Sequence, residues 1–269
     1  MTSSSFPTKV LKEMVYNTLE IKQNQSLVRI ALNRPKVMNA LNEEMIRETT
    51  HAFDMIGKDD SVRVIVLEGN GKTFSAGADL SYMKQSGEMN IDQNTEQGIR
   101  LGNMYRSIER CPKPVIAKAH GYAIGGGFGF MVLADIAIAE TQTKFALSEV
   151  KLGMNPAVIG PFVVKRIGLS HFKSLGITGE MIDSNHALRI GLIHEISDKE
   201  GLENAVMKKV NILLKGGPNA IAEFKANFDN MDRNEAAARI AKLRASDEGQ
   251  EGLSAFLEKR PPNWVDSIG

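Results

Sequence analysis

Short apolar runs alternate with amphipathic segments through the first 200 residues of the chain. Four of these runs are rich in β-branched or small apolar residues and predict strands: Leu27–Leu32, Val62–Leu67, Val115–Ala119 and Ile136–Ala139. The near-continuous β-branched run Val62–Leu67 is typical of a strand covered on both faces. Pro35 follows the first run and ends it, because proline cannot donate to a strand ladder.

Helical segments lie between these runs. Asn42 is suited to cap a helix, and Glu43 and Glu44 would complement the helix dipole in its first turn. We expect this helix to reach about Ile56, with an apolar side made of Met45, Ile46, Thr49, Ala52, Phe53 and Ile56. Further helices are expected at roughly 93–110 and 126–133. Strand–helix alternation of this kind predicts an α/β domain.

The pattern changes after about residue 200. From Leu202 to Leu257 the chain is rich in Ala, Glu, Lys and Leu and has no convincing strand. We therefore predict an α/β core over residues 1–200 and a helical region over residues 201–269. Within the core, residues 1–15 are expected to form a loose polar lead-in.

Composition narrows the classes of function. The 269 residues are 42% hydrophobic and 24% charged, which is typical of a folded globular chain. A net charge of +1 and the lack of a basic block argue against nucleic acid as a partner. Cys111 is the only cysteine, so an intrachain disulfide is excluded and a reducing compartment is indicated. Without a signal peptide or a membrane-spanning run, a cytoplasmic protein is expected.

Several familiar motifs are absent. Gly71-Lys72-Thr73 lacks the earlier glycine of a phosphate-binding loop, and Phe130 breaks the dinucleotide fingerprint after the glycines at 125–127. No serine lies in a G-x-S-x-G nucleophile elbow. The five histidines and Cys111 show no metal-ligand spacing, so no metal site is predicted.

A turn of small residues, Phe74–Leu80 (FSAGADL), follows the second predicted strand. Small residues let the backbone approach a ligand closely, and Asp79 could cap a following helix. A tight strand-to-helix turn without a ligand explains this stretch equally well.

Three consecutive glycines, at positions 125–127, precede another predicted helix. Each glycine inside a helix costs about 1 kcal/mol relative to alanine, so the run needs a reason. The start of a helix presents unpaired N–H groups and a positive dipole end, which suit an anion. Close packing of helix on sheet is the alternative.

Glu149 lies in the largely apolar stretch Phe145–Val150. A desolvated carboxylate there would have a raised pKa and could act as a general base or acid near neutrality. From this stretch alone, an ion pair with Lys144, Lys151 or Arg166 is the simpler explanation.

Taken together, the two glycine-rich turns and the carboxylate about twenty residues later closely resemble the crotonase (enoyl-CoA hydratase/isomerase) superfamily. The resemblance runs from Asn33–Leu41 (NRPKVMNAL) to Ser254–Arg260 (SAFLEKR). It implies a spiral of ββα units followed by a C-terminal helical trimerisation region, assembled as a homotrimer or a dimer of trimers. It also implies an acyl-coenzyme A substrate, with coenzyme A as part of the substrate and no separate cofactor.

The resemblance also assigns site residues. Two backbone amides, of Ala76 and Gly126, would form an oxyanion hole for the thioester carbonyl, where fixed donors stabilise developing charge. Glu149 would be the catalytic carboxylate. The residues implied to contact coenzyme A are Lys36, Val37, Asn39, Ala76, Gly77, Ala78, Asp79, Leu80, Gly126, Phe256 and Lys259, the last two sometimes reaching a neighbouring subunit.

Position 129 departs from the two-glutamate pattern of common hydratases, because it is Gly129. One carboxylate can in principle serve both steps of a concerted hydration, and a single base naturally serves a Δ3,Δ2-enoyl-CoA isomerase. The segments 149–168 and 74–83 are similar to 3-methylglutaconyl-CoA and isoprenylglutaconyl-CoA hydratases, which favours hydration. The missing side chain at 129 would also make room for a branched acyl group. A non-catalytic acyl-CoA-binding member of the fold is the third alternative.

Overall fold

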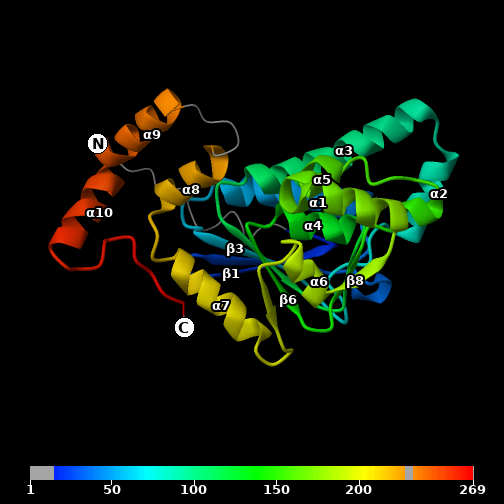
Figure 1. Ribbon diagram of the computed structural model, residues 1–269, viewed down its shortest axis with the longest axis horizontal. Helices are drawn as coiled ribbons and strands as arrows, with labels where there is room; N and C mark the ends of the chain where they lie inside the picture. Colours follow the sequence, from blue (N-terminus) through cyan, green and yellow to red (C-terminus); the bar gives the residue numbers. More distant parts are fainter. Residues whose placement is uncertain (1–14, 228–232, 269) are drawn as a thin grey trace.

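The computed structural model describes residues 15–227 and 233–268. The predicted lead-in, apart from its last residue, lies outside the described residues. The described chain forms two β-sheets with helices on their faces and a helical extension at the C-terminal end (Figure 1).

The larger sheet has six strands in the order β1-β2-β3-β4-β6-β9. Only β1 and β2 pair in antiparallel register; the other neighbours are parallel. The strands are β1 (Leu19–Asn24), β2 (Leu27–Leu32), β3 (Val64–Gly69), β4 (Val115–Ala119), β6 (Ile136–Glu140) and β9 (Glu195–Ser197). All four predicted strands are confirmed, and β3 begins two residues later than expected.

A second sheet contains three strands of three residues each, in the order β5-β7-β8. They are β5 (Tyr122–Ile124), β7 (Lys144–Ala146) and β8 (Met181–Asp183). This sheet places the chain before the glycine triplet next to the chain before Glu149, because β5 and β7 pair in parallel.

The helices of the core cover the region between and beside the two sheets. The predicted helix after Asn42 is confirmed as α1 (Glu43–Gly57), with the Asn42 side chain accepting from the Met45 amide. The other predicted helices are α3 (Ile91–Arg110) and α4 (Gly126–Leu133). Shorter or unpredicted elements are η1 (Pro35–Val37), α2 (Leu80–Glu88), η2 (Glu149–Leu152), α5 (Gly160–Thr178) and α6 (Ser184–Arg189).

Two apolar cores hold these layers together. The main core joins the inner sides of α1, α3, α4 and α5 to one face of the large sheet. A second core lies on the opposite face, where Leu202, Val206 and Val210 of α7 (Leu202–Leu213) cover Val64 and Val66 of β3. Burial on both faces explains why β3 is a near-continuous β-branched run.

The remaining helices, α8 (Pro218–Asn227), α9 (Arg233–Ala245) and α10 (Asp247–Leu257), project from the end of the molecule opposite α2 (Figure 1). Glu248 of α10 caps α8 by accepting from the amides of Asn219 and Ala220. No described strand follows β9. The helical region after residue 200 therefore has two parts, since α7 belongs to the core and α8–α10 extend from it.

Candidate active site

The two small-residue turns predicted from the sequence lie against each other. Backbone bridges join Leu41 to Ala78 and Ser75 to Ala123. These bridges place the turn after β3 beside the turn that leads into α4. Three segments that are distant in sequence thus meet at one place: the loop after η1 and both glycine-rich turns.

Glycine is required at the point of contact. Gly77 has φ +97°, and a side chain there would start 3.0 Å from the Ile124 carbonyl oxygen. Gly125 has φ +50° and ψ −113° and directly precedes α4. Such backbone conformations are strained for residues with a Cβ atom. The close approach of the two turns is therefore built on glycine, as the sequence indicated.

A ligand oxygen can be bound by backbone N–H groups that have no acceptor within the protein. Ala76 N–H donates to the Met38 carbonyl at 3.0 Å, so it is not free. Among the described residues, the amides of Ala78 and Gly126 have no acceptor. Gly126 is the first residue of α4, where helix geometry leaves N–H groups unpaired. The sequence-based choice of Ala76 as a free donor is corrected, and the free amide of this turn is that of Ala78, which is exposed.

Glu149 begins η2, directly beyond β7. A Cβ atom built on Gly125 would lie 3.3 Å from Glu149 Oε1, so the carboxylate lies beside the start of α4. Glu149 Oε2 is buried and has no hydrogen-bond partner in the described part of the chain. Burial raises the pKa of Glu149, and a hydrogen bond from its own backbone opposes this only in part.

The ion-pair explanation for Glu149 is wrong. No salt bridge joins Glu149 to Lys144, Lys151 or Arg166 in the described structure. The Arg166 guanidinium instead donates to carbonyls at the end of α4, including that of Val132 at 3.2 Å. The half-buried carboxylate has no ion-pair partner among the described residues and lies beside free amides, which is the arrangement expected of a proton-transfer group.

Position 129 is not an open space. A Cβ atom on Gly129 would lie 2.9 Å from the ring and hydroxyl of Tyr105, a residue of α3. Tyr105 is fully buried and packs edge-on against Phe130 and Phe162. The expectation of extra room for a branched acyl group is corrected, because the Tyr105 ring fills that volume. Sequence reasoning missed Tyr105, whose only signal was its place within the predicted 93–110 helix.

The residues expected to contact coenzyme A fall into two groups, exposed and buried. Lys36 and Val37 in η1, and Leu80 at the start of α2, are exposed beside the site. Asn39 is buried, and its side chain accepts from the Arg34 amide and donates to the carbonyls of Asn70 and Thr73. Asn39 therefore shapes the loop from within and has no amide group left to offer a ligand.

Asp79 also supports the turn from within. Its carboxylate accepts from the Ser81 and Tyr82 amides at the start of α2 and pairs with Arg34 at 2.8 Å. Burial alone would raise the pKa of Asp79, but these hydrogen bonds outweigh it and hold the pKa below its ordinary value. The carboxylate stays charged and fixes the direction in which the Ala76–Ala78 turn enters α2.

The predicted C-terminal contacts are not brought to this site. Phe256 is 81% exposed in α10, and Lys259 follows directly beyond that helix. α10 and α2 lie at opposite ends of the molecule (Figure 1). Within one chain, therefore, Phe256 and Lys259 cannot cover a ligand held by the Ala78 and Gly126 turns.

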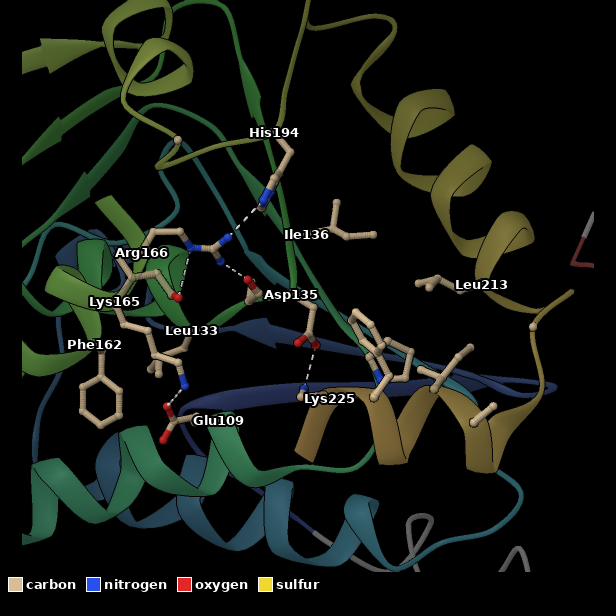
Figure 2. A pocket seen from close by; sticks show the side chains of 18 of the residues that line it. Glu109, Leu133, Asp135, Ile136, Phe162, Lys165, Arg166, His194, Leu213 and Lys225 are labelled. Atoms are coloured by element: carbon tan, nitrogen blue, oxygen red, sulfur yellow. Dashed lines mark hydrogen bonds and ion pairs between the residues drawn. The ribbon is translucent and has the colours of Figure 1, made fainter. Parts of the chain in front are cut away.

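A cavity of about 860 Å³ lies elsewhere, between the ends of α4 and α5 and the helices α7 and α8 (Figure 2). Its charged side chains have partners: Lys165 pairs with Glu109 at 3.2 Å and Lys225 with Asp135 at 2.6 Å, while Arg166 donates to backbone carbonyls at the end of α4. Neither Glu149 nor the free amides line it. Its residues provide no unpaired acid or donor for chemistry, so we place the candidate active site at the two turns.

The described residues lack two further features. No group of three or more His, Cys, Asp or Glu side chains in residues 15–227 and 233–268 is placed to hold a metal ion. Over the same residues, none of the helices combines the length and apolar character needed to cross a bilayer.

Comparison with known proteins gives one consistent family. The family model described as enoyl-CoA hydratase/isomerase matches residues 22–267. A crotonyl-CoA hydratase of Syntrophomonas wolfei is 33% identical, over 94% of this chain and 99% of that protein. A trans-2-decenoyl-[acyl-carrier-protein] isomerase of Streptococcus mutans is 29% identical, over 94% and 98%. The crystal structure of an enoyl-CoA hydratase from Shewanella pealeana superposes with a TM-score of 0.89 at 36% identity, over 92% and 96%.

Proposed function

The chain belongs to the enoyl-CoA hydratase/isomerase family, and from this premise we propose that it adds water across the C2=C3 bond of an enoyl-CoA thioester. The observation that carries the proposal is the Glu149 carboxylate beside the start of α4, whose buried Oε2 has no hydrogen-bond partner among the described residues. A site that only bound the thioester would not need a carboxylate with a buried oxygen that lacks a partner, because such burial is costly.

The oxyanion hole is assigned to the amides of Ala78 and Gly126. Both N–H groups lack an acceptor among the described residues, and their turns are in contact through Gly77 and Gly125. A thioester carbonyl between them would receive two hydrogen bonds as its oxygen gains charge during attack at C3. Because the donors are backbone groups of a rigid contact, they need no reorganisation.

Glu149 is assigned to both proton transfers. Its carboxylate takes a proton from water as the water oxygen bonds to C3, and the electrons of C2=C3 move toward the thioester carbonyl. The proton then passes from Glu149 to C2, which restores the carboxylate and completes the 3-hydroxyacyl thioester. A raised pKa favours this cycle, because an acid with a pKa closer to neutrality can both take and return a proton.

The substrate is proposed to be a branched or glutaconyl-type enoyl-CoA. The support is the similarity of segments 74–83 and 149–168 to glutaconyl-type hydratases. Position 129 no longer supports it, since Tyr105 fills that space. Straight-chain, branched and glutaconyl-type enoyl-CoAs, assayed side by side, decide this proposal by their relative kcat/KM.

The direct test of the proposed function is turnover by the purified chain. Hydration removes the ultraviolet absorbance of the enoyl thioester and yields a product one water heavier. If a 3-enoyl-CoA is instead converted to a 2-enoyl-CoA of unchanged mass, the chain is an isomerase. The single carboxylate and the isomerase relative from Streptococcus mutans make this the second candidate. Binding of acyl-CoA without turnover across the panel would indicate a non-catalytic member.

A homotrimer or a dimer of trimers is proposed for the assembly. α8–α10 extend from the core and expose large apolar side chains, among them Phe224, Phe256 and Leu257. Exposed aromatic residues on a projecting element favour an interface with another chain. In such an assembly Phe256 and Lys259 of one copy could reach the nucleotide held by another copy.

A further inference from the structure

Tyr105 lies under the helix start that carries one of the two free amides. A Cβ atom on Gly126 would lie 3.3 Å from the Tyr105 hydroxyl. The carbonyl oxygen of Gly126 lies 3.4 Å from the same hydroxyl. The same added Cβ would lie 3.0 Å from Leu41 Cδ2. Gly126 thus packs closely against both an aliphatic side chain and a tyrosine.

The Tyr105 ring and Gly129 fit each other as one unit. The ring occupies the place where a side chain at 129 would begin, at 2.9 Å from an added Cβ. Phe130 and Phe162 fix the ring edge-on, at centroid distances of 6.3 and 6.1 Å. A glycine at 129 is therefore the condition for Tyr105 to reach Gly126.

We propose that Tyr105 is a positioning residue of this site, whose hydroxyl donates to the Gly126 carbonyl and thereby holds the Gly126 amide in place as an oxyanion donor. The inference rests on the proposed function only in taking that amide as a ligand donor. It assigns a role to a residue that does not touch the reacting atoms.

The protonation state of Tyr105 agrees with this role. Burial, and after it the charge of Glu149 and the presence of Tyr82, raise the pKa of Tyr105 well above its ordinary value. The hydroxyl therefore remains protonated and can donate. The 3.4 Å separation is long for an O–H···O bond, and hydrogen bonds around active sites commonly shorten when substrate binds.

The backbone around Gly126 explains why such support is needed. Residues 125–127 carry no side chains of their own, so contacts from neighbouring segments must hold their peptide planes. Gly127 is restrained from one side by Ser75, whose carbonyl oxygen would lie 2.6 Å from an added Cβ. Tyr105 supplies a polar contact on the first residue of the helix, at the peptide next to the one that carries the donor.

The test measures the carbonyl stretching frequency of bound crotonyl-CoA by infrared difference spectroscopy. The ligand carries ¹³C at the thioester carbon, and the protein is Glu149→Gln, in which turnover is suppressed. We expect the frequency to fall on binding. Tyr105→Phe, added to Glu149→Gln, keeps the ring and should lose a substantial part of that fall. Tyr16→Phe is the matched control, because its hydroxyl contacts His51, away from the site.

In protein with Glu149 intact, Tyr105→Phe should lower kcat by about 3- to 10-fold, the range of one neutral hydrogen bond, with KM changed less than about twofold. A frequency and a kcat equal to those of the unchanged protein would overturn the inference. A missing frequency shift in the parent Glu149→Gln protein would instead refute the oxyanion assignment itself, and the role of Tyr105 with it. The two failures are therefore distinguishable.

Gly129→Ala tests the second half of the inference. Its methyl group would begin 2.9 Å from the Tyr105 ring, so we expect a lower melting temperature, a smaller frequency shift, or both. Gly102→Ala on α3 is the control, since its methyl group would meet Val158 at an ordinary 3.7 Å. If Gly129→Ala behaves like Gly102→Ala in both measurements, Tyr105 does not depend on the glycine.

Discussion

Glu149 combines features that seldom occur together in a residue with only a structural role. Its Oε2 is buried without a hydrogen-bond partner, and its Oε1 lies beside Gly125 at the start of α4. A structural carboxylate in such a place would normally be paired, as Asp79 is with Arg34. The cost of leaving Glu149 unpaired is explained if the partner is the reacting substrate.

Glu149→Gln should separate activity from stability. Hydratase kcat is expected to fall by roughly 100- to 10,000-fold, the usual contribution of a general acid–base group. The free energy of unfolding near neutral pH should rise, because a neutral amide replaces a desolvated charge. Steady-state kinetics and urea unfolding check the two effects. Full activity in this variant would eliminate Glu149 as the acid–base group.

The pH dependence of stability follows from the same carboxylate. Its folded-state pKa is raised above the ordinary value of 4.5, so the folded protein binds more protons than the unfolded chain between those two values. The contribution of Glu149 to stability is therefore lost as pH rises through that interval. The difference in unfolding free energy between the wild type and Glu149→Gln should become less favourable to the wild type over this range. A difference that stays constant with pH would contradict the raised pKa.

The pH dependence of activity has the opposite direction. The carboxylate must be deprotonated to accept a proton from water, so kcat/KM should rise as pH passes upward through the raised pKa of Glu149. A pH–rate profile gives the midpoint of this rise. A midpoint at or below 4.5 would show that burial does not govern the titration.

At the scale of elements, the site is a contact between a turn and a helix start. Leu41 N–H donates to the Gly77 carbonyl, and Asp79 N–H donates to the Leu41 carbonyl. This register leaves the Ala78 amide between them without an acceptor, whereas the Ala76 amide bonds to Met38. Ala76 and Ala78 are chemically alike, so their hydrogen bonding alone determines which amide is the free donor of this turn.

Replacing a single amide by an ester tests that selection. Lactate in place of Ala78 removes the N–H and keeps the side chain, so kcat should fall by about 100- to 1000-fold, as for the loss of one oxyanion donor. Lactate in place of Ala76 is the matched control, and it should lower the melting temperature through the lost Met38 bond while largely preserving kcat. The reverse result would restore Ala76 as the donor.

At the scale of the whole molecule, the C-terminal helices lie far from the site of their own chain (Figure 1). α7 covers the large sheet, but α8–α10 leave Phe256 81% exposed at the other end. Exposed apolar side chains do not stabilise a single copy of the chain, whereas their burial against another copy would stabilise an assembly.

Phe256→Glu tests the proposed assembly. If α10 lies in an interface, a buried charge there should reduce the mass measured by light scattering, and KM for acyl-CoA should rise as well if the residue reaches a neighbour's site. Ile99→Glu places the same charge on an exposed position of α3, where no change in mass is expected. An unchanged mass for Phe256→Glu would exclude this residue from the interface.

Local sequence determined much of the framework. β-branched runs and the Asn42 cap specified four strands and α1, because buried strands and capped amphipathic helices leave signals within a few residues. The same local patterns marked the two glycine turns and Glu149, since glycine and an acid in an apolar stretch are unusual on their own. The strands β5, β7 and β8 could not be predicted in the same way, because three-residue strands are stabilised by their partner strands and not by their own composition.

Only the tertiary structure decided which groups of the site are free. The sequence alone does not tell which alanine amide remains unpaired, because the register with Leu41 determines it. Nor does the sequence tell that the space beside Gly129 is filled. Tyr105 lies 24 positions earlier, in α3, and contacts the glycine only once the helices have packed. The positions of reactive residue types can be read from the local sequence. Which amides remain unpaired, and which spaces are filled, depends on contacts between segments that are distant along the chain.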